Sequence, residues 1–404
     1  MDNIYHNIIS RIMHFSIGLS LIIILSLLIS KNIKNIQIRY IIQVLIIEII
    51  IGYFILHSTI GLESIQKICY LFDTLLFFAS KGTNFVFGDI NTHKTTSIFF
   101  LNVLCPIIFI SSIIGILQYS HILIHIINTI GILLSKISGM GKLESFNIIS
   151  SLILGQSENF IIYKDIIAHI SEPRIYTMAA TAMSTVSLSM ISVYMTMLNP
   201  KYVIAALLLN MFSTIIILSL INPYTINPEQ DLYIPYFITK NNNFFTIIGE
   251  YILIGFNIAT TVAAMLIGFI ALITATNTIF KIIFGISLQH ILSYIFLPFT
   301  WTIGIPIAEI LPVSKIMATK LITNEFVAMI DLQKILHTLS TRSIGILSIF
   351  LVSFSNFTSI GIIIGTITKL NTTQGKIIAH YGLRLIYSST LVNLLSATIA
   401  SLIL

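Results

Sequence analysis

The residues best suited to chemistry in this 404-residue sequence read G-Q-S-E at positions 155–158, where an amide, a hydroxyl and a carboxylate follow a glycine. Residues 146–157 carry no charge, and an apolar run resumes over 159–163. An ionisable group in such surroundings is a functional-site hypothesis by default. Each flank has about a dozen residues, whereas a spanning helix needs about 20. A break at Gly155 therefore predicts a re-entrant hairpin, with an ordinary loop between two short helices as the alternative.

The composition places these residues in a membrane protein. The sequence is 56% hydrophobic and 9% charged, against roughly 25% charged in a soluble domain. The net charge of +6 is spread thinly, so nothing in it indicates nucleic-acid binding. Cys69 and Cys105 form no metal or disulfide pattern, and we interpret them as small apolar residues. No cofactor is predicted.

Long apolar segments predict transmembrane helices. They lie at 16–30, 40–57, 97–117, 176–198, 202–222, 250–276, 344–366 and 385–404. The loop between the first two carries Lys31, Lys34 and Arg39 and no acid, which predicts a cytoplasmic loop and an external N-terminus. Residues 61–80 and 118–137 mix charged and apolar residues, and we interpret them as interfacial helices. A polar linker is predicted at 223–243.

A second set of polar interruptions follows the first. The predicted span at 176–198 contains a hydroxyl-rich stretch at 184–189, which indicates either hydrogen bonds back to its own helix or an unwound segment. Later, residues 288–314 are broken by Gly304-Ile305-Pro306, and a span is predicted around Asn324 and Glu325. Polar residues interrupt the next span at 354–359. Paired discontinuous segments in two halves indicate a secondary transporter.

The interrupted segments supply hydrogen-bonding side chains rather than an enzyme motif. No G-x-x-x-x-G-K-[ST], H-E-x-x-H or G-x-S-x-G occurs in the sequence, so we predict no enzymatic activity. The candidate binding residues are Gln156, Ser157, Glu158, Asn324, Glu325, Asn356 and Ser359, with Phe354 and Phe357 as aromatic neighbours. No clustered arginines are present to hold a phosphate. These groups suit a neutral polyhydroxylated or heterocyclic ligand, and interhelical hydrogen bonds are the alternative role for each.

Four motifs in this order resemble the signatures of the concentrative nucleoside transporters. They are G-Q-S-E at 155–158, G-I-P-x-x-E at 304–309, N-E-F-V at 324–327 and F-S-N-F-T-S at 354–359. The resemblance runs from about residue 90 to the C-terminus. The sequence closely resembles the bacterial NupC-type permeases, as the stretches at 184–187 and 317–320 also indicate.

The resemblance implies the fold and the cellular setting. It implies an all-α integral membrane protein with eight transmembrane helices plus two re-entrant helical hairpins in an inverted-repeat transport domain. It also implies a homotrimer in the bilayer of the bacterial inner membrane and an elevator-like movement. The expected regions are 1–138 (N-terminal spans and interfacial helices, part of the scaffold), 139–222 (first hairpin and following spans), 223–249 (polar linker and interfacial segment) and 250–404 (scaffold span, second hairpin, broken span and C-terminal span).

The resemblance also assigns roles to individual residues. Gln156, Ser157 and Glu158 would face the nucleobase. Glu325, together with Asn356 and Ser359, would take the ribose hydroxyls. Phe354 and Met190 would supply apolar contact. The implied function is symport of a nucleoside with a cation, and a symporter of another small neutral solute, a channel and a membrane-embedded enzyme are the alternatives.

The identity of the coupling cation depends on four positions. Sodium-coupled members hold the ion at positions that correspond here to Ser151, Leu154, Thr185 and Val186. Ser151 stands where those members carry asparagine, and Leu154 and Val186 offer only backbone carbonyls. We therefore predict H+ as the coupling ion, with Na+ at these positions as the alternative. Glu158 and Glu325 are the candidate proton carriers, because burial favours the neutral form of a carboxylic acid.

Overall fold

The computed structural model describes residues 2–88, 98–164, 166–225 and 243–404, and every regular element in these ranges is helical. The predicted all-α class is thereby confirmed. Seven helices of the described chain are long and apolar enough to cross a membrane. The predicted span at 344–366 is present as two shorter helices, α15 (Thr341–Leu351) and α16 (Phe357–Leu370). Most of the predicted linker at 223–243 lies outside the described residues.

Three helices precede the first repeat. They are α1 (Asp2–Leu28), α2 (Ile38–His57) and α3 (Thr59–Phe87), with a 3-10 turn η1 (Ile33–Asn35) between α1 and α2. The predicted interfacial helix at 61–80 corresponds to α3, which is longer than predicted. Ser58 begins this helix, because its hydroxyl accepts a hydrogen bond from the Gly61 N–H at 2.8 Å.

Two stretches of the chain then run through the same order of elements. The first comprises the π-helical turn η3 (Phe100–Leu104), α4 (Pro106–Tyr119), α5 (Ile122–Ser138), α6 (Lys142–Leu154), α7 (Glu158–Ile161), η4 (Ile167–His169), α8 (Glu172–Ser184), α9 (Leu188–Met197) and α10 (Pro200–Ile221). The second comprises α11 (Phe244–Phe284), α12 (Leu288–Thr302), α13 (Ile307–Ile322), α14 (Glu325–Ile335), η6 (Leu336–Thr338), α15, α16, α17 (Thr372–His380) and α18 (Gly382–Ile403). Each stretch has a long helix, an amphipathic helix, a hairpin ending in a 3-10 turn, a broken span and a final span, and the second stretch has the additional helix α17 before its final span.

The predicted position of the second hairpin break was wrong. The turn at Gly304-Ile305-Pro306 joins α12 to α13, so it corresponds to the turn between α5 and α6. Glycines with positive φ stand in both turns, Gly139 at 69° and Gly304 at 78°, a conformation that glycine adopts without a steric cost. The second hairpin instead consists of α13 and α14, with its tip at Thr323 and Asn324. The predicted continuous span around Asn324 is therefore interrupted.

The first hairpin breaks where predicted, although its return arm differs. α6 ends at Leu154, and Gly155 follows with φ of 100°. The return arm contains only the four-residue α7 and the turn η4, in place of the predicted dozen apolar residues in one helix. The predicted span at 176–198 is also broken, because Thr185, Val186 and Ser187 separate α8 from α9. Both interpretations of its hydroxyls hold: the chain is unwound at 185–187, and Ser184 and Thr185 donate back to carbonyls of α8.

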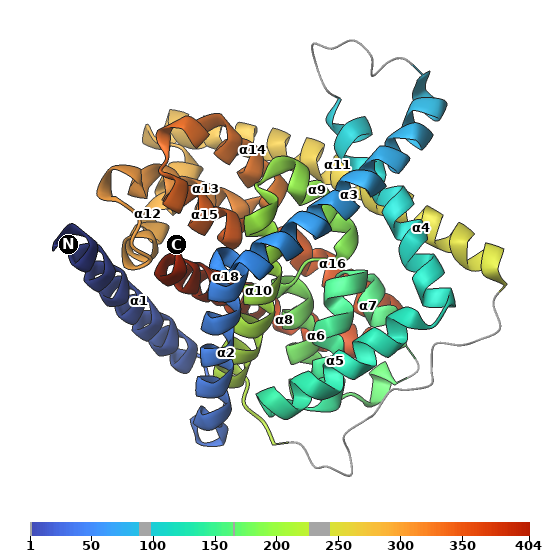
Figure 1. Ribbon diagram of the computed structural model, residues 1–404, viewed down its shortest axis with the longest axis horizontal. Helices are drawn as coiled ribbons and strands as arrows, with labels where there is room; N and C mark the ends of the chain where they lie inside the picture. Colours follow the sequence, from blue (N-terminus) through green and yellow to red (C-terminus); the bar gives the residue numbers. More distant parts are fainter. Residues whose placement is uncertain (1, 89–97, 165, 226–242) are drawn as a thin grey trace.

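The final span of each repeat forms the centre of the molecule. α10 and α18 pack against each other and are mostly buried, and α1 and α2 lie against them. α11 packs along α4, on the opposite side of the molecule from α1 in Figure 1.

Candidate binding site

A cavity of about 490 Å³ lies between α11, the first hairpin and the two broken spans. Its volume is within the roughly 300–1,000 Å³ typical of small-molecule sites. The tip residues Gln156, Ser157 and Glu158 line it, and α11 contributes a mostly apolar wall on the other side. The three residues predicted to face the nucleobase therefore line the same cavity.

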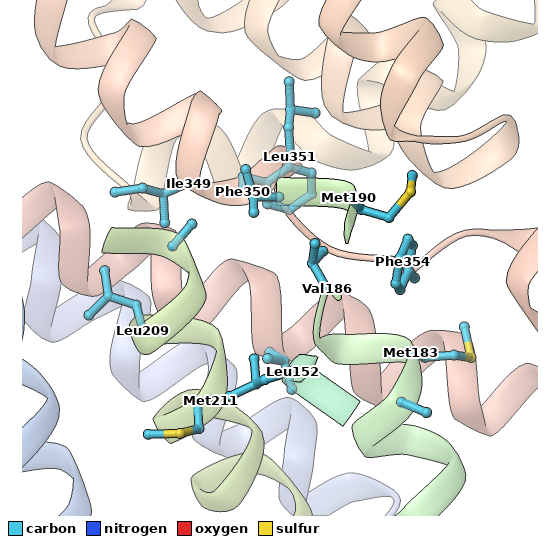
Figure 2. Packing of buried hydrophobic residues seen from close by; sticks show 14 of the residues in the cluster. Leu152, Met183, Val186, Met190, Leu209, Met211, Ile349, Phe350, Leu351 and Phe354 are labelled. Carbon is cyan, nitrogen blue, oxygen red and sulfur yellow. The ribbon is translucent and has the colours of Figure 1, made fainter. Parts of the chain in front are cut away.

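A smaller cavity of about 60 Å³ continues toward the second hairpin. Glu325, Asn356 and Ser359 line it, and these are the three residues predicted for the ribose. Gln156 lines both cavities, as do Met190 and Phe354. Figure 2 shows Met190 on α9 and Phe354 on the second unwound stretch. The structure thus brings the eight predicted binding residues to two adjoining cavities.

The backbone at Gly155 positions the first hairpin tip. A Cβ atom at this position would lie 2.9 Å from Glu158 Oε2 and 3.2 Å from Ser187 Cβ. Together with the positive φ, this crowding requires glycine, and it allows the tip to touch the unwound stretch between α8 and α9. Gln156 Oε1 is buried and accepts no hydrogen bond from the described residues. An unpaired amide oxygen in a cavity is a ready acceptor for a ligand donor.

The carboxylate of Glu325 is held in a fixed orientation. Tyr194 Oη donates to Glu325 Oε1 at 2.7 Å, and Asn356 Nδ2 donates to Oε2 at 2.9 Å. Glu325 is 3% exposed and begins α14, where the unpaired N–H groups of the helix favour an anion. Each oxygen retains lone pairs, so the carboxylate can still accept from hydroxyl donors of a ligand.

The remaining polar candidates serve partly as helix caps. Asn356 is the N-cap residue of α16, and its Oδ1 accepts a hydrogen bond from the Ser359 N–H at 2.9 Å. Asn324 Oδ1 accepts from the Val327 N–H at 3.0 Å and begins α14. Phe357 is half exposed and lines neither cavity. Of the two predicted aromatic neighbours, only Phe354 therefore lines the cavities.

The four predicted cation positions surround the junction of the first hairpin with the first unwound stretch. All four are buried. Ser151 Oγ accepts a hydrogen bond from Asn159 Nδ2 at 2.7 Å, and Thr185 Oγ1 donates to the Thr181 carbonyl at 3.0 Å. Leu154 and Val186 present no side-chain oxygen. Among the described residues, no three His, Cys, Asp or Glu side chains lie close enough together to hold a metal ion.

The sequence analysis missed a polar network inside the first hairpin. Asn159 donates to Asn147 Oδ1 and to Ser151 Oγ, both at 2.7 Å, and accepts from Ser150. The Ser150 hydroxyl also contacts the Tyr163 hydroxyl at 3.1 Å. These bonds join the two arms directly behind the tip. Asn159 adjoins the G-Q-S-E motif and could have been found from it, whereas Asn147 is hidden in a run without charges.

A buried ion pair at the base of the same hairpin was also missed. Arg174 donates to both carboxylate oxygens of Glu144, from Nε at 2.5 Å and from Nη2 at 2.9 Å. Tyr224 donates to Glu144 Oε1 at 2.8 Å. This pair ties the start of α6 to the start of α8.

Comparison with known proteins identifies the family. Family models described as the Na+ dependent nucleoside transporter N-terminus and C-terminus match residues 17–90 and 202–401, and a model described as nucleoside recognition matches 100–201. The chain is 35% identical to the purine nucleoside transport protein NupG of Bacillus subtilis, covering 96% of this chain and 98% of the relative. The chain belongs to the concentrative nucleoside transporter family.

This transporter is similar to further members of the family. It is 26% identical to the nucleoside permease NupC of Helicobacter pylori, with 96% of both chains covered. The structure of CNTnw in an inward-facing substrate-bound state superposes with a TM-score of 0.90 at 26% identity and covers 97% of this chain and 99% of that one. The transporter is therefore a cation-coupled, multi-pass protein of the bacterial inner membrane and not an enzyme, as predicted.

Proposed function

We propose that this transporter imports nucleosides together with protons, and that the two adjoining cavities hold the nucleoside. The observation that carries the proposal is the Glu325 carboxylate, oriented by Tyr194 and Asn356 at the smaller cavity. A carboxylate and an amide fixed beside each other can accept from and donate to the vicinal hydroxyls of a ribose. Ser359 supplies a further hydroxyl to the same cavity.

The larger cavity takes the nucleobase. Gln156 Oε1 is buried and unpaired among the described residues, which suits an amino or ring N–H donor on a base. Ser157 and Glu158 add polar groups beside it, while Phe354 and Met190 offer apolar surfaces to a flat ring. The name of the Bacillus subtilis relative states purine nucleoside transport, so purine nucleosides are among the proposed substrates.

Proton coupling is supported by the hydrogen bonds and the side-chain types at the four predicted cation positions. The side-chain amide of Asn159 donates a hydrogen bond from Nδ2 to Ser151 Oγ at 2.7 Å. This donor competes with a cation for the same oxygen. Leu154 and Val186 offer only backbone carbonyls, so few oxygen ligands are available to coordinate a metal cation. A proton carried by a carboxylic acid needs no such coordination shell, and the carboxylic acid Glu158 lines the larger cavity.

Sodium coupling is the second candidate. The description of the matching family models names sodium, and Thr185 and Ser151 each present a hydroxyl oxygen at the junction. In that case the ion occupies the four cation positions and Glu158 stays charged. The two candidates differ in which gradient drives uptake.

The mechanism we propose moves the site across the membrane as a unit. The hairpins α6–α7 and α13–α14 are re-entrant, and with the broken spans they form a transport domain that slides along a scaffold containing α4 and α11. The apolar residues of α11 that line the larger cavity provide a surface suited to such sliding. Three copies assemble as a homotrimer around their scaffolds. The residue ranges 1–138, 139–222, 223–249 and 250–404 are the proposed regions of this arrangement.

Uptake of labelled uridine and inosine into proteoliposomes tests the proposal, with proton and sodium gradients imposed separately. We expect uptake to increase as the external pH falls, to collapse with a protonophore and to persist without sodium. A proton-motive force of about 100 mV supplies roughly 2.3 kcal/mol per charge, near fiftyfold accumulation. Uptake that requires sodium and resists a protonophore would show sodium coupling instead.

A further inference from the structure

A single acidic side chain lies in the middle of α2. Glu48 is the eleventh of the 20 residues of this helix and is fully buried. The buried residues of α2 recur at every fourth position, and the other three are Val44, Gly52 and Leu56. Because α2 is long and apolar enough to cross a membrane, an ionised side chain at its centre is costly and marks a candidate functional group.

α2 packs closely around Glu48. A Cβ atom at Gly52, one turn further along α2, would lie 3.1 Å from Leu209 Cδ2 of α10 and 2.6 Å from Ile403 Cδ1 of α18. Ser213 Oγ of α10 donates to Glu48 Oε1 at 2.6 Å. The second oxygen, Oε2, is buried and has no hydrogen-bond partner among the described residues. One half of this carboxyl group is therefore enclosed by protein without a partner.

No cation compensates Glu48 in the part of the chain that the structure describes. The helices packed against α2 are α3, α5, α10 and α18. Their acidic, basic and histidine side chains are Glu63, Lys67, Asp73 and Lys81 of α3, His125 and Lys136 of α5, Lys201 of α10 and Arg384 of α18. Of the described side chains, Ser213 is the one that bonds to Glu48. A buried carboxyl group with one donor and no counter-ion takes up a proton rather than carry a charge. Since Oε1 accepts from Ser213, the proton resides on Oε2.

The helix that bonds to Glu48 also holds the second unwound stretch. Asn210 lies one turn before Ser213 on the same face of α10. It is 1% exposed, and its Nδ2 donates to the Val352 carbonyl at 2.5 Å. Val352 directly follows α15 and opens the stretch that leads to Asn356 at the smaller cavity. An ionised Glu48 would compete with the Val352 carbonyl for this amide donor, whereas the neutral acid leaves the bond in place.

We propose that Glu48 is a second proton-binding site of the transporter, and that its proton keeps the second unwound stretch in its nucleoside-binding form. The proposal rests on the nucleoside-binding role proposed above for that stretch. Glu48 lines neither cavity and is fully buried, so this proton is separate from the coupling proton assigned to Glu158. Glu48 is a positioning residue, because it reaches the ligand only through α10 and the stretch that carries Asn356.

Infrared difference spectroscopy of purified wild type and Glu48→Gln, without nucleoside at neutral pH, tests the protonated state. We expect the variant to lose a protonated carboxylic acid band and no carboxylate band. Glu63→Gln, which replaces an exposed acid on α3, is the matched control and should lose a carboxylate band. Loss of a carboxylate band in Glu48→Gln would overturn the proposal. This readout needs no ligand, so it is independent of whether the proposed substrate or coupling ion is correct.

Equilibrium binding of uridine and inosine from neutral to strongly alkaline pH tests what the proton does. Glu48→Gln keeps the shape of the neutral acid and should bind as wild type at neutral pH. As the pH rises, wild type and Glu63→Gln should lose at least tenfold in affinity, and Glu48→Gln should lose less because an amide does not ionise. In the wild type, the protonated band and the affinity should be lost over the same pH range. Equal pH profiles for wild type and Glu48→Gln, whether flat or falling, or weaker binding by Glu48→Gln already at neutral pH, would overturn the proposal.

Discussion

The two hairpins follow similar backbone paths but use different chemistry to hold their tips. Behind the first tip, Asn159 joins the arms through neutral amides and hydroxyls. Behind the second tip, the ammonium of Lys320 bonds to the unwound stretch, and the Glu325 carboxylate lies across the tip. The hairpin bases show the opposite contrast: Glu144 pairs with the charged Arg174 in the first repeat, whereas Glu309 in the second accepts hydrogen bonds from the neutral Ser340.

This difference indicates a division of labour. The second tip is tied to the unwound stretch by the Lys320 side chain, and two donors fix the orientation of the Glu325 carboxylate, which suits a part of the site that recognises ribose in every cycle. A tip held by neutral groups can gain or lose one charge without an uncompensated ion elsewhere. In the function proposed above, the first repeat therefore responds to the coupling ion, and the second binds the ribose that all nucleosides share.

The largest expected effect is a loss of stability that differs between the bases of the two hairpins. Arg174→Met leaves Glu144 buried without its cation, and breaking a buried pair in this way costs about 3–5 kcal/mol of stability. Arg342→Met should cost less, because Arg342 bonds to the Gly304 and Ser401 carbonyls and leaves no carboxylate unpaired. Thermal unfolding of both variants in detergent measures the difference.

A double variant checks the physical reason for that loss. Glu144→Gln/Arg174→Met removes both charges and should recover part of the stability lost in Arg174→Met. Equal melting temperatures for Arg174→Met and Arg342→Met would contradict the proposed contrast between the bases.

The next effect separates substrate binding from folding. Glu325→Gln keeps the shape of the side chain but loses charge-assisted hydrogen bonds, worth about 1.5–3 kcal/mol, or roughly 10- to 100-fold in affinity. We expect nucleoside binding and uptake to fall by more than tenfold while assembly persists. Asp331→Asn on the same helix, where Asp331 pairs with Lys334 at the surface, is the matched control. Normal uridine transport by Glu325→Gln would exclude Glu325 from the site.

A smaller effect distinguishes the base from the sugar. Gln156→Ala and Glu158→Gln should change the ratio of purine to pyrimidine nucleoside uptake, because an unpaired buried polar group penalises the wrong partner. Competition of unlabelled nucleosides against labelled uridine measures this ratio. If every nucleoside lost affinity by the same factor, the first hairpin would not read the base.

The smallest expected effect concerns the ion. Ser151→Asn places a longer amide at the junction of the first hairpin with the first unwound stretch, and its carbonyl oxygen adds a ligand for a cation. We expect a modest sodium stimulation of uptake that the wild type lacks. Ser150→Asn, one residue away in the hydrogen-bond network of Asn159, is the matched control and should show none. Sodium stimulation of equal size in the wild type would contradict proton coupling.

The sequence predicted which residues line the two cavities better than it predicted the architecture around them. Glycine and polar residues within apolar runs identified Gly155, Glu325 and Asn356, because a buried polar group stands out against its neighbours. The second hairpin was misplaced because Gly304 and Pro306 are stronger breakers than Thr323 and Asn324. The break at the tip comes from Asn324 capping α14, a local bond that composition does not reveal.

The pairs that hold the hairpins could not be predicted from spacing. Glu144 and Arg174 are 30 positions apart, as are Lys320 and the Phe350 carbonyl. Each pair forms only when a hairpin and the following broken span lie together. The resemblance to a family supplied the roles of the binding residues, while the residues that position them required the tertiary structure.

The division of labour is tested most directly by recording proton entry and nucleoside entry together in sodium-free proteoliposomes. We expect inosine or uridine flux in the wild type to carry protons inward. Glu158→Gln should uncouple the proton from the remaining nucleoside flux, and Glu325→Gln should slow both fluxes while keeping their ratio. Nucleoside flux without proton entry in the wild type, or an unchanged ratio in Glu158→Gln with a changed one in Glu325→Gln, would contradict the account.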